Sequence, residues 1–169
     1  MRKMIVIQYT SMIVLCFVSG VVCYQLFQID QVMQIIEWGD RRLLTMDKPQ
    51  LLWNAVPFIA ALGIVLFFST HHYLTMIAPI FIALKSTFLG FSSVFLLVHL
   101  QSVKLYALWW FPFQLLYCIF LIMLFVSSRP KRMSRTIKKQ SITKSVMFFC
   151  GVMIILFGLE NFVISYLFK

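Results

Sequence analysis

Five long apolar runs, separated by polar stretches, restrict what this chain can fold into. Each run has at least the roughly 20 residues that a helix needs to cross about 30 Å of hydrocarbon. Only 12% of the 169 residues are charged, whereas about a quarter is typical of soluble domains. The sequence therefore predicts an all-α, polytopic membrane helix bundle that forms one integral membrane domain over residues 1–169. The expected spans are 4–27, 51–70, 73–100, 107–126 and 146–167.

The third run carries a charge and a stripe of small residues, both within Ile80–Leu97. Lys85 lies near its middle, and a lysine at the centre of a span costs roughly 2.5–3.5 kcal/mol, so such residues usually face the protein interior. Small residues at helical spacing let two helix backbones approach closely in lipid. This span is therefore expected to be central, with a tight seam formed by Ala83, Ser86, Gly90 and Ser93.

Basic residues set the expected orientation. Seven of the 15 basic residues lie between Arg129 and Lys144, with no acid among them. In a chain of this composition such a run indicates a cytoplasmic loop, here 127–145, rather than nucleic-acid binding. Arg2 and Lys3 place the N-terminus on the same side, and five spans then leave the C-terminus outside. No nucleic-acid partner is expected.

The outer connector, 28–50, holds four acidic and three basic residues. Within it Ile29, Val32, Met33 and Ile36 recur at the spacing of one helix face. Two interpretations stay open: an amphipathic helix on the outer membrane interface, or a connector whose apolar side chains lie against the bundle. Trp109, Trp110 and Phe111, at the start of the fourth run, are typical of an interfacial aromatic belt.

Glu160 is the second charge within the apolar runs. Counted from the inner ends of their spans, Lys85 and Glu160 lie roughly 18 and 21 Å deep. Two opposite charges at one depth favour an ion pair; the alternative is that each bonds elsewhere or reaches the interface. Gln114 and Asn161 are candidates to complete a polar cluster.

Motifs for catalysis and for cofactor binding are missing. The sequence has no HExxH, GxSxG, P-loop or Rossmann glycine pattern. His71 and His72 point apart on a helix, which argues against a metal site, and the four cysteines lie inside apolar runs as small hydrophobic residues. The expected protein is not an enzyme and needs no metal or cofactor.

Three segments carry a further pattern, in chain order. The first, 82–92, has the sequence IALKSTFLGFS and contains Lys85, Ser86, Gly90 and Phe91. The second, 110–117, is WFPFQLLY, with Pro112 and Gln114. The third, 157–165, is FGLENFVIS, with Glu160 followed by Asn161.

Together these segments resemble the stage II sporulation protein M family. Ser86 stands where that family usually has glycine, and Gln114 stands in place of asparagine. The resemblance implies an all-helical bacterial cell-membrane protein without catalytic activity that anchors partner proteins. In sporulating bacteria the partners are peptidoglycan hydrolases, whereas shorter relatives occur in circular bacteriocin gene clusters and are linked to maturation, secretion or immunity. The short outer connector favours the latter group.

The expected partners are the lipid bilayer and other membrane or extracytoplasmic proteins of the same gene cluster, with homo- or hetero-oligomers as a further option. The leading functional prediction is a membrane scaffold or assembly protein. A permease subunit, alone or with a separate ATPase, is the alternative, because buried charges such as Lys85 and Glu160 also mark transport paths.

Overall fold

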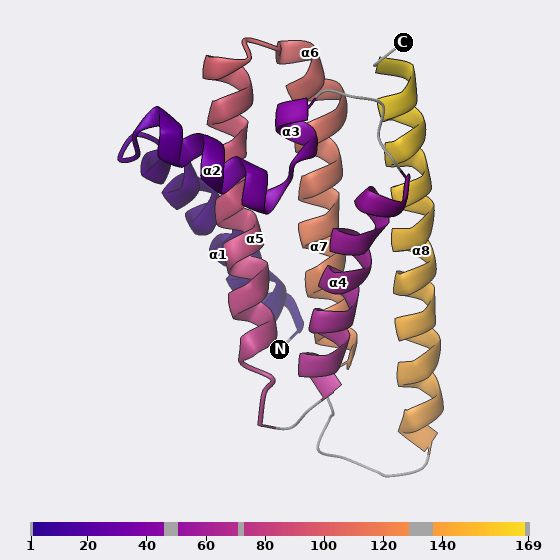
Figure 1. The fold of residues 1–169 in the computed structure, drawn as a ribbon. Coiled ribbons are helices and arrows are strands. Elements are labelled where there is room, and N and C mark those ends of the chain that lie inside the picture. The colour runs from indigo at the N-terminus through magenta and orange to yellow at the C-terminus, as the bar shows by residue number, and fades with distance from the viewer. Residues whose placement is uncertain (1, 46–50, 71–72, 129–136, 168–169) are drawn as a thin grey trace.

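The computed structural model describes residues 2–45, 51–70, 73–128 and 137–167, and these residues contain helices and no strand. The polar connector forms two short helices, and the apolar runs form the long ones (Figure 1). Two five-residue π-helices, η1 and η2, extend the facing ends of α5 and α7. The elements are α1 Arg2–Tyr24, α2 Ile29–Gly39, α3 Arg42–Thr45, α4 Leu51–Thr70, α5 Ile77–Val94, η1 Phe95–His99, α6 Val103–Leu105, η2 Tyr106–Trp110, α7 Phe111–Ser128 and α8 Ile137–Leu167.

The predicted all-α membrane bundle is confirmed. The long helices α1, α4, α5, α7 and α8 alternate in direction along the chain (Figure 1). Helix α4 has 20 residues, and its described apolar stretch is Ala55–Ser69. In–out orientation stays a prediction. Four helices of the described chain are long and apolar enough to cross a membrane: Ile7–Tyr24, Ile77–His99, Val103–Ser128 and Lys144–Leu167.

The helix ends differ from the expected spans, and the differences at the starts of α5 and α8 bear on the bundle. Helix α5 begins at Ile77, four residues after the expected start of its span, so Pro79 lies in the first turn, where a missing N–H costs little. Helix α8 begins at Ile137, so the second part of the expected basic loop is already helical. The remainder of that loop, 129–136, and the His71–His72 pair lie outside the described residues.

Among the described helices, α1 and α5 approach each other backbone to backbone. A Cβ atom on Gly90 would overlap the backbone carbonyl of Phe17, and Gly20 lies in the same way against the α5 backbone. One helical turn from Gly90, the Ser86 hydroxyl donates to the Ile13 carbonyl at 2.9 Å. The small residues thus let two parallel helices meet backbone to backbone, in agreement with the predicted seam at Ser86 and Gly90.

The connector helix α2 lies across the bundle with its apolar side inward (Figure 1). Val32 and Ile36 are buried in a cluster that includes Leu89 of α5 and Trp109 of η2, whereas Trp38 is 93% exposed. Of the two interpretations of the connector, the structure therefore supports the one in which its hydrophobic residues contact the bundle. This contact brings the C-terminal end of α2, at Gly39 and Asp40, to the polar interior of the helix bundle.

The π-helix η2 explains how the fourth span tolerates a proline. The Phe111 N–H donates to the Tyr106 carbonyl, five residues back, so the helix is widened immediately before Pro112. Proline lacks an N–H, and its ring clashes with the carbonyl four residues back. The wider turn accommodates that ring in a helix that continues to Ser128, and it leaves both Trp109 and Trp110 buried.

Candidate functional site

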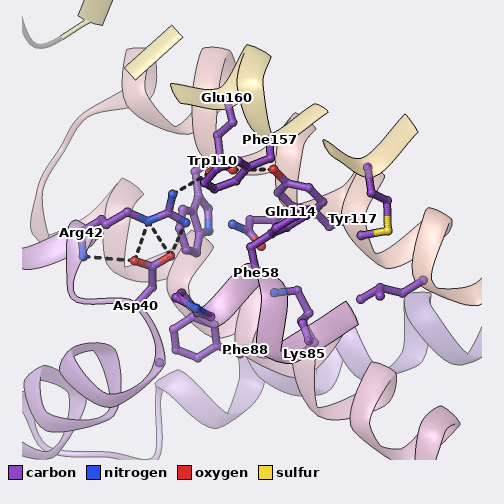
Figure 2. A pocket seen from close by; sticks show the side chains of 15 residues that line it. Asp40, Arg42, Phe58, Lys85, Phe88, Trp110, Gln114, Tyr117, Phe157 and Glu160 are labelled. Atoms are coloured by element: carbon purple, nitrogen blue, oxygen red, sulfur yellow. Dashed lines mark hydrogen bonds and ion pairs between the residues drawn. The ribbon is translucent and has the colours of Figure 1, made fainter. Parts of the chain in front are cut away.

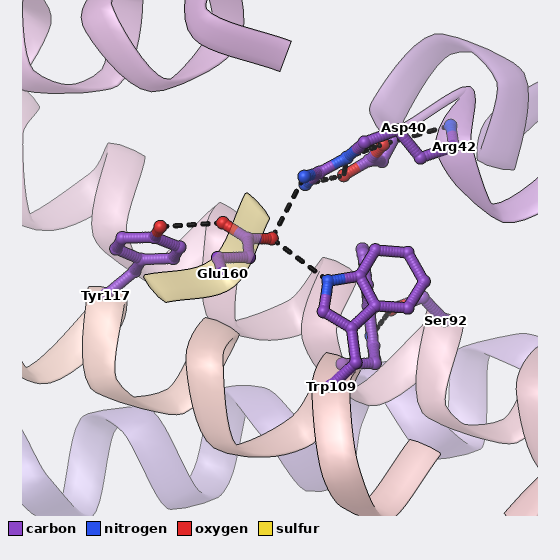
Figure 3. A network of polar contacts seen from close by, with 7 residues as sticks. Asp40, Arg42, Ser92, Trp109, Tyr117 and Glu160 are labelled. Atoms are coloured by element: carbon purple, nitrogen blue, oxygen red, sulfur yellow. Dashed lines mark hydrogen bonds and ion pairs between the residues drawn. The ribbon is translucent and has the colours of Figure 1, made fainter. Parts of the chain in front are cut away.

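A buried carboxylate is the centre of the polar interior. Glu160 of α8 is 1% exposed and accepts hydrogen bonds from three side chains of other elements (Figure 3). Arg42 donates through its guanidinium at 2.9 Å, Trp109 through its indole N–H at 3.2 Å, and Tyr117 through its hydroxyl at 2.6 Å. These bonds connect α3, η2, α7 and α8 at one point.

The end of α2 places Arg42 against this carboxylate. The Asp40 N–H donates to the Ile36 carbonyl and ends the helix, and Gly39 lies so close to the Phe88 ring that a side chain there would overlap it. The Asp40 carboxylate then accepts from the Arg42 Nε at 2.8 and 3.0 Å and from a terminal guanidinium nitrogen at 2.6 Å. The turn between α2 and α3 is therefore held in the shape that directs the guanidinium inward.

Arg42 stays charged in this setting. Burial by itself would lower the pKa of its guanidinium, but hydrogen bonding and attraction to Asp40, and then to Glu160, raise that pKa above its ordinary value. The guanidinium carbon also lies 5.6 Å from the centroid of the Trp109 ring, within the range of a cation–π contact. One cation thus serves two carboxylates, and the three side chains together carry one net negative charge.

A cavity of about 60 Å³ adjoins this group (Figure 2). Asp40, Arg42 and Glu160 line it together with Lys85, Gln114 and Tyr117, while aromatic rings such as Phe58 and Phe88 complete the wall. The cavity therefore combines charged groups of both signs with an apolar surround.

The structure excludes the direct ion pair between Lys85 and Glu160 and supports the alternative, in which Glu160 bonds elsewhere. In the described chain, the Glu160 carboxylate forms its ion pair with the guanidinium of Arg42, at 2.9 Å. Lys85, on α5, and Glu160, on α8, line the same cavity without reaching ion-pair distance of each other.

The other predicted site residues divide between the seam and the cavity. Ser86 and Gly90 belong to the α1–α5 seam, and next to them Phe91 contacts the ring of Tyr24 edge-on. Gln114 lines the cavity, as the cluster hypothesis required. Asn161 donates to the Phe157 carbonyl of its own helix and is not part of the cavity wall.

Sequence reasoning missed the partners of Glu160. It placed Trp109 and Trp110 in an interfacial belt, but both are at most 2% exposed, and the Trp110 indole donates to the Ser92 hydroxyl at 2.9 Å. It counted Arg42 only as one charge of a nearly neutral connector. The available signal was its position directly after an amphipathic helix, from which a basic side chain can reach a buried acid.

Comparisons with protein-family models, with curated proteins and with solved structures found no match. The resemblance to the stage II sporulation protein M family therefore stays a prediction from the sequence. Among the residues that the structure describes, no group of three or more His, Cys, Asp or Glu side chains has the geometry of a metal site.

Removing the Tyr117 hydroxyl tests whether its hydrogen bond to Glu160 stabilises the bundle. Tyr117→Phe keeps the ring but leaves one carboxylate oxygen without its 2.6 Å donor. Hydrogen bonds to charged groups contribute about 1.5–3 kcal/mol, so we expect a loss of that size in the free energy of unfolding in detergent micelles. Tyr166→Phe, on the exposed side of α8, is the matched control and should change little. Equal effects of the two changes would contradict the assignment.

Proposed function

We propose that this chain is a non-enzymatic membrane scaffold that holds a folded outer cap, α2 and α3, above a helix bundle and presents it to partner proteins. The observation that supports this most is the bonding of Glu160. Its carboxylate, on α8, accepts one hydrogen bond from the cap, through Arg42, and one each from η2 and α7. Buried groups with their bonds satisfied in this way stabilise one arrangement, as a platform requires.

The size of the cavity supports the same proposal. Sites for small organic ligands have volumes of about 300–1,000 Å³, whereas the cavity beside Glu160 has about 60 Å³. A path for an organic substrate would need a much larger opening between the helices. The interior of the bundle thus fits a structural role better than the passage of a metabolite.

The biological setting follows from the resemblance to the stage II sporulation protein M family. We place the chain in a bacterial cell membrane, where it serves the maturation or secretion of a circular bacteriocin, or immunity to it. Its partners are membrane or extracytoplasmic proteins from the same gene cluster. Anchoring of peptidoglycan hydrolases during sporulation or envelope remodelling is the alternative setting for the same scaffold.

One observation favours a second function, a permease subunit for a small ion. Lys85 lines the cavity and has no ion-pair or hydrogen-bond partner among the described residues. Intramembrane charges of this kind also mark ion pathways.

Co-purification distinguishes the scaffold from the permease. A tagged chain is expressed in its own host with the products of the neighbouring genes, and the proteins recovered with it from solubilised membranes are identified. The scaffold predicts a stable complex, and purified chain in liposomes should then show no flux of labelled ions or small organic solutes. Flux by the chain alone, with no protein recovered, would reject the scaffold and favour the permease.

An exposed residue of the cap provides the matched variant. Trp38 of α2 is 93% exposed, and Tyr166 of α8 is 76% exposed. Tryptophans at interface hot spots contribute about 2 kcal/mol or more. Trp38→Ala should therefore reduce recovery of the partner at least about tenfold, whereas Tyr166→Ala should not. A loss of recovery with Tyr166→Ala, and none with Trp38→Ala, would indicate that the partner binds to α8 and not to the cap.

A further inference from the structure

Lys85 is the cation of the bundle interior that the Glu160 network does not use. It lies on α5, partly buried, and lines the cavity opposite the end of α2 (Figure 2). Within the described chain its ammonium has neither a hydrogen-bond partner nor an acid within ion-pair distance. An ammonium has three N–H donors, and an unsolvated charge of this kind is costly in a membrane interior. Something other than these side chains must accept its hydrogen bonds.

The charges around the cavity show which acceptor fits. Arg42 is shared by Asp40 and Glu160, so that end of the cavity carries one net negative charge. Lys85 adds one positive charge, and the wall as a whole is neutral. An additional anion would disturb this balance, and an additional cation would disturb it equally. A neutral ligand that both donates and accepts hydrogen bonds can bridge the two ends without changing it.

The volume of the cavity points to the same ligand. A water molecule requires roughly 10–15 Å³ of such space and two to four polar partners. The cavity offers about 60 Å³, with Gln114 and Tyr117 on its wall in addition to the charged groups. It is therefore large enough for several water molecules, and its wall has the polar groups that hold them.

We propose that this cavity is a hydrated site in continuity with the aqueous phase. Its water molecules solvate the Lys85 ammonium and bridge it to the carboxylates of Asp40 and Glu160. The ligand class is water, and the site gives the bundle a second, solvent-separated charge pair beside the direct pair of Arg42. Lys85 is thereby a solvated, chemically accessible amine within a membrane span. The inference does not depend on the scaffold proposal, because a hydrated cavity exists with or without a partner protein.

Thiol labelling tests hydration directly, in membranes that contain the full chain with its four native cysteines replaced by serine or alanine. Lys85→Cys is compared with Leu84→Cys, the adjacent residue, which is 65% exposed on the surface of the bundle. The reagent is 2-aminoethyl methanethiosulfonate. It reacts with the thiolate, which forms in water and is suppressed in an apolar setting, so position 85 should react at least about tenfold faster than position 84.

The same reagent supplies a second readout. Its adduct at position 85 ends in a primary ammonium and is close in length to lysine, so modification should restore stability that Lys85→Cys has lost. Modification at position 84 should restore nothing. Faster reaction at position 84 would indicate a dry cavity and would overturn the proposal. Equal rates at the two positions would also overturn it, since the cavity would then be no more hydrated than the lipid-facing surface.

A second pair of variants covers the case in which Lys85→Cys does not fold. Gln114→Cys places the thiol on the part of the cavity wall that α7 contributes, and Leu116→Cys places it on the outer side of the same helix. A hydrated cavity predicts faster labelling at position 114. Slower or equal labelling there would reject the hydrated site independently of Lys85.

Discussion

Replacing Arg42 with methionine should lower the free energy of unfolding by about 3–5 kcal/mol, because it leaves the buried carboxylate of Glu160 and the partly buried one of Asp40 without their cation. Arg42 binds both Asp40 and Glu160, and the side chain of Glu160 is 2% exposed. Membrane proteins, like other proteins, have limited stability to lose, with about 5–15 kcal/mol typical of folded domains. We therefore expect Arg42→Met to accumulate poorly and to unfold at much lower temperature in detergent micelles.

The neighbouring arginine is the control for this change. Arg41 has the same charge, but its side chain is 75% exposed and lies 4.0 Å from Glu37. Exposed pairs contribute about 0–1 kcal/mol, so Arg41→Met should leave the unfolding transition almost unchanged. Equal losses in the two variants would mean that the net charge of the connector, and not the position of Arg42 beside Glu160, determines the stability.

Gly90→Leu should prevent the approach of α1 to α5. A Cβ atom on Gly90 would already overlap the carbonyl of Phe17, which is backbone and cannot move aside as a side chain does. Ordinary overpacking costs about 1–3 kcal/mol, and four added carbons against a backbone should exceed that range. The expected result is loss of folded protein, together with loss of the contact between Ser86 and Ile13.

A glycine outside the seam, Gly158, provides the control for Gly90→Leu, because the same glycine-to-leucine change can be made there. Gly158 lies within α8, and a Cβ atom there would have no neighbour within 4 Å. Leucine is a better helix former than glycine by about 0.5–1 kcal/mol. Gly158→Leu should thus be neutral or slightly stabilising, opposite in sign to Gly90→Leu. Destabilisation by both variants to the same extent would show that the membrane-facing surface, not the seam, limits the fold.

The fold was largely predictable because hydrophobicity in a membrane is a strong local signal. Length and polarity of the apolar runs are enough to indicate long membrane helices, since backbone groups in lipid must bond within their own helix, but not to fix where those helices end. The seam at Gly90 was predictable for a similar reason, because small residues at helical spacing serve close approach. Both features can be recognised within a single segment of sequence.

The site was predictable only in part, because its partners come from distant segments. Glu160 and Gln114 were recognised as interior polar residues, but 118 positions separate Arg42 from Glu160. No local pattern gives the direction in which α2 crosses the bundle, and that direction decides which cation reaches the acid. The expected pairing with Lys85 failed because counting residues along single spans leaves out cations of the connector such as Arg42.

The central claim is that Arg42 of the cap, and not Lys85 of α5, neutralises the charge of Glu160. A pair of double-mutant cycles tests this claim most directly. Unfolding free energies are measured for Glu160→Leu, for Arg42→Met, for Lys85→Met, and for the two double variants that contain Glu160→Leu. Residues in one ion-pair network show coupling of about 0.5–3 kcal/mol, while separated residues add within about 0.3–0.5 kcal/mol. The structure predicts coupling near the upper end of that range for Arg42 with Glu160, which bond directly, and at most its lower end for Lys85 with Glu160, which share only the cavity. Strong coupling of Lys85 to Glu160, with Arg42 additive, would contradict the account.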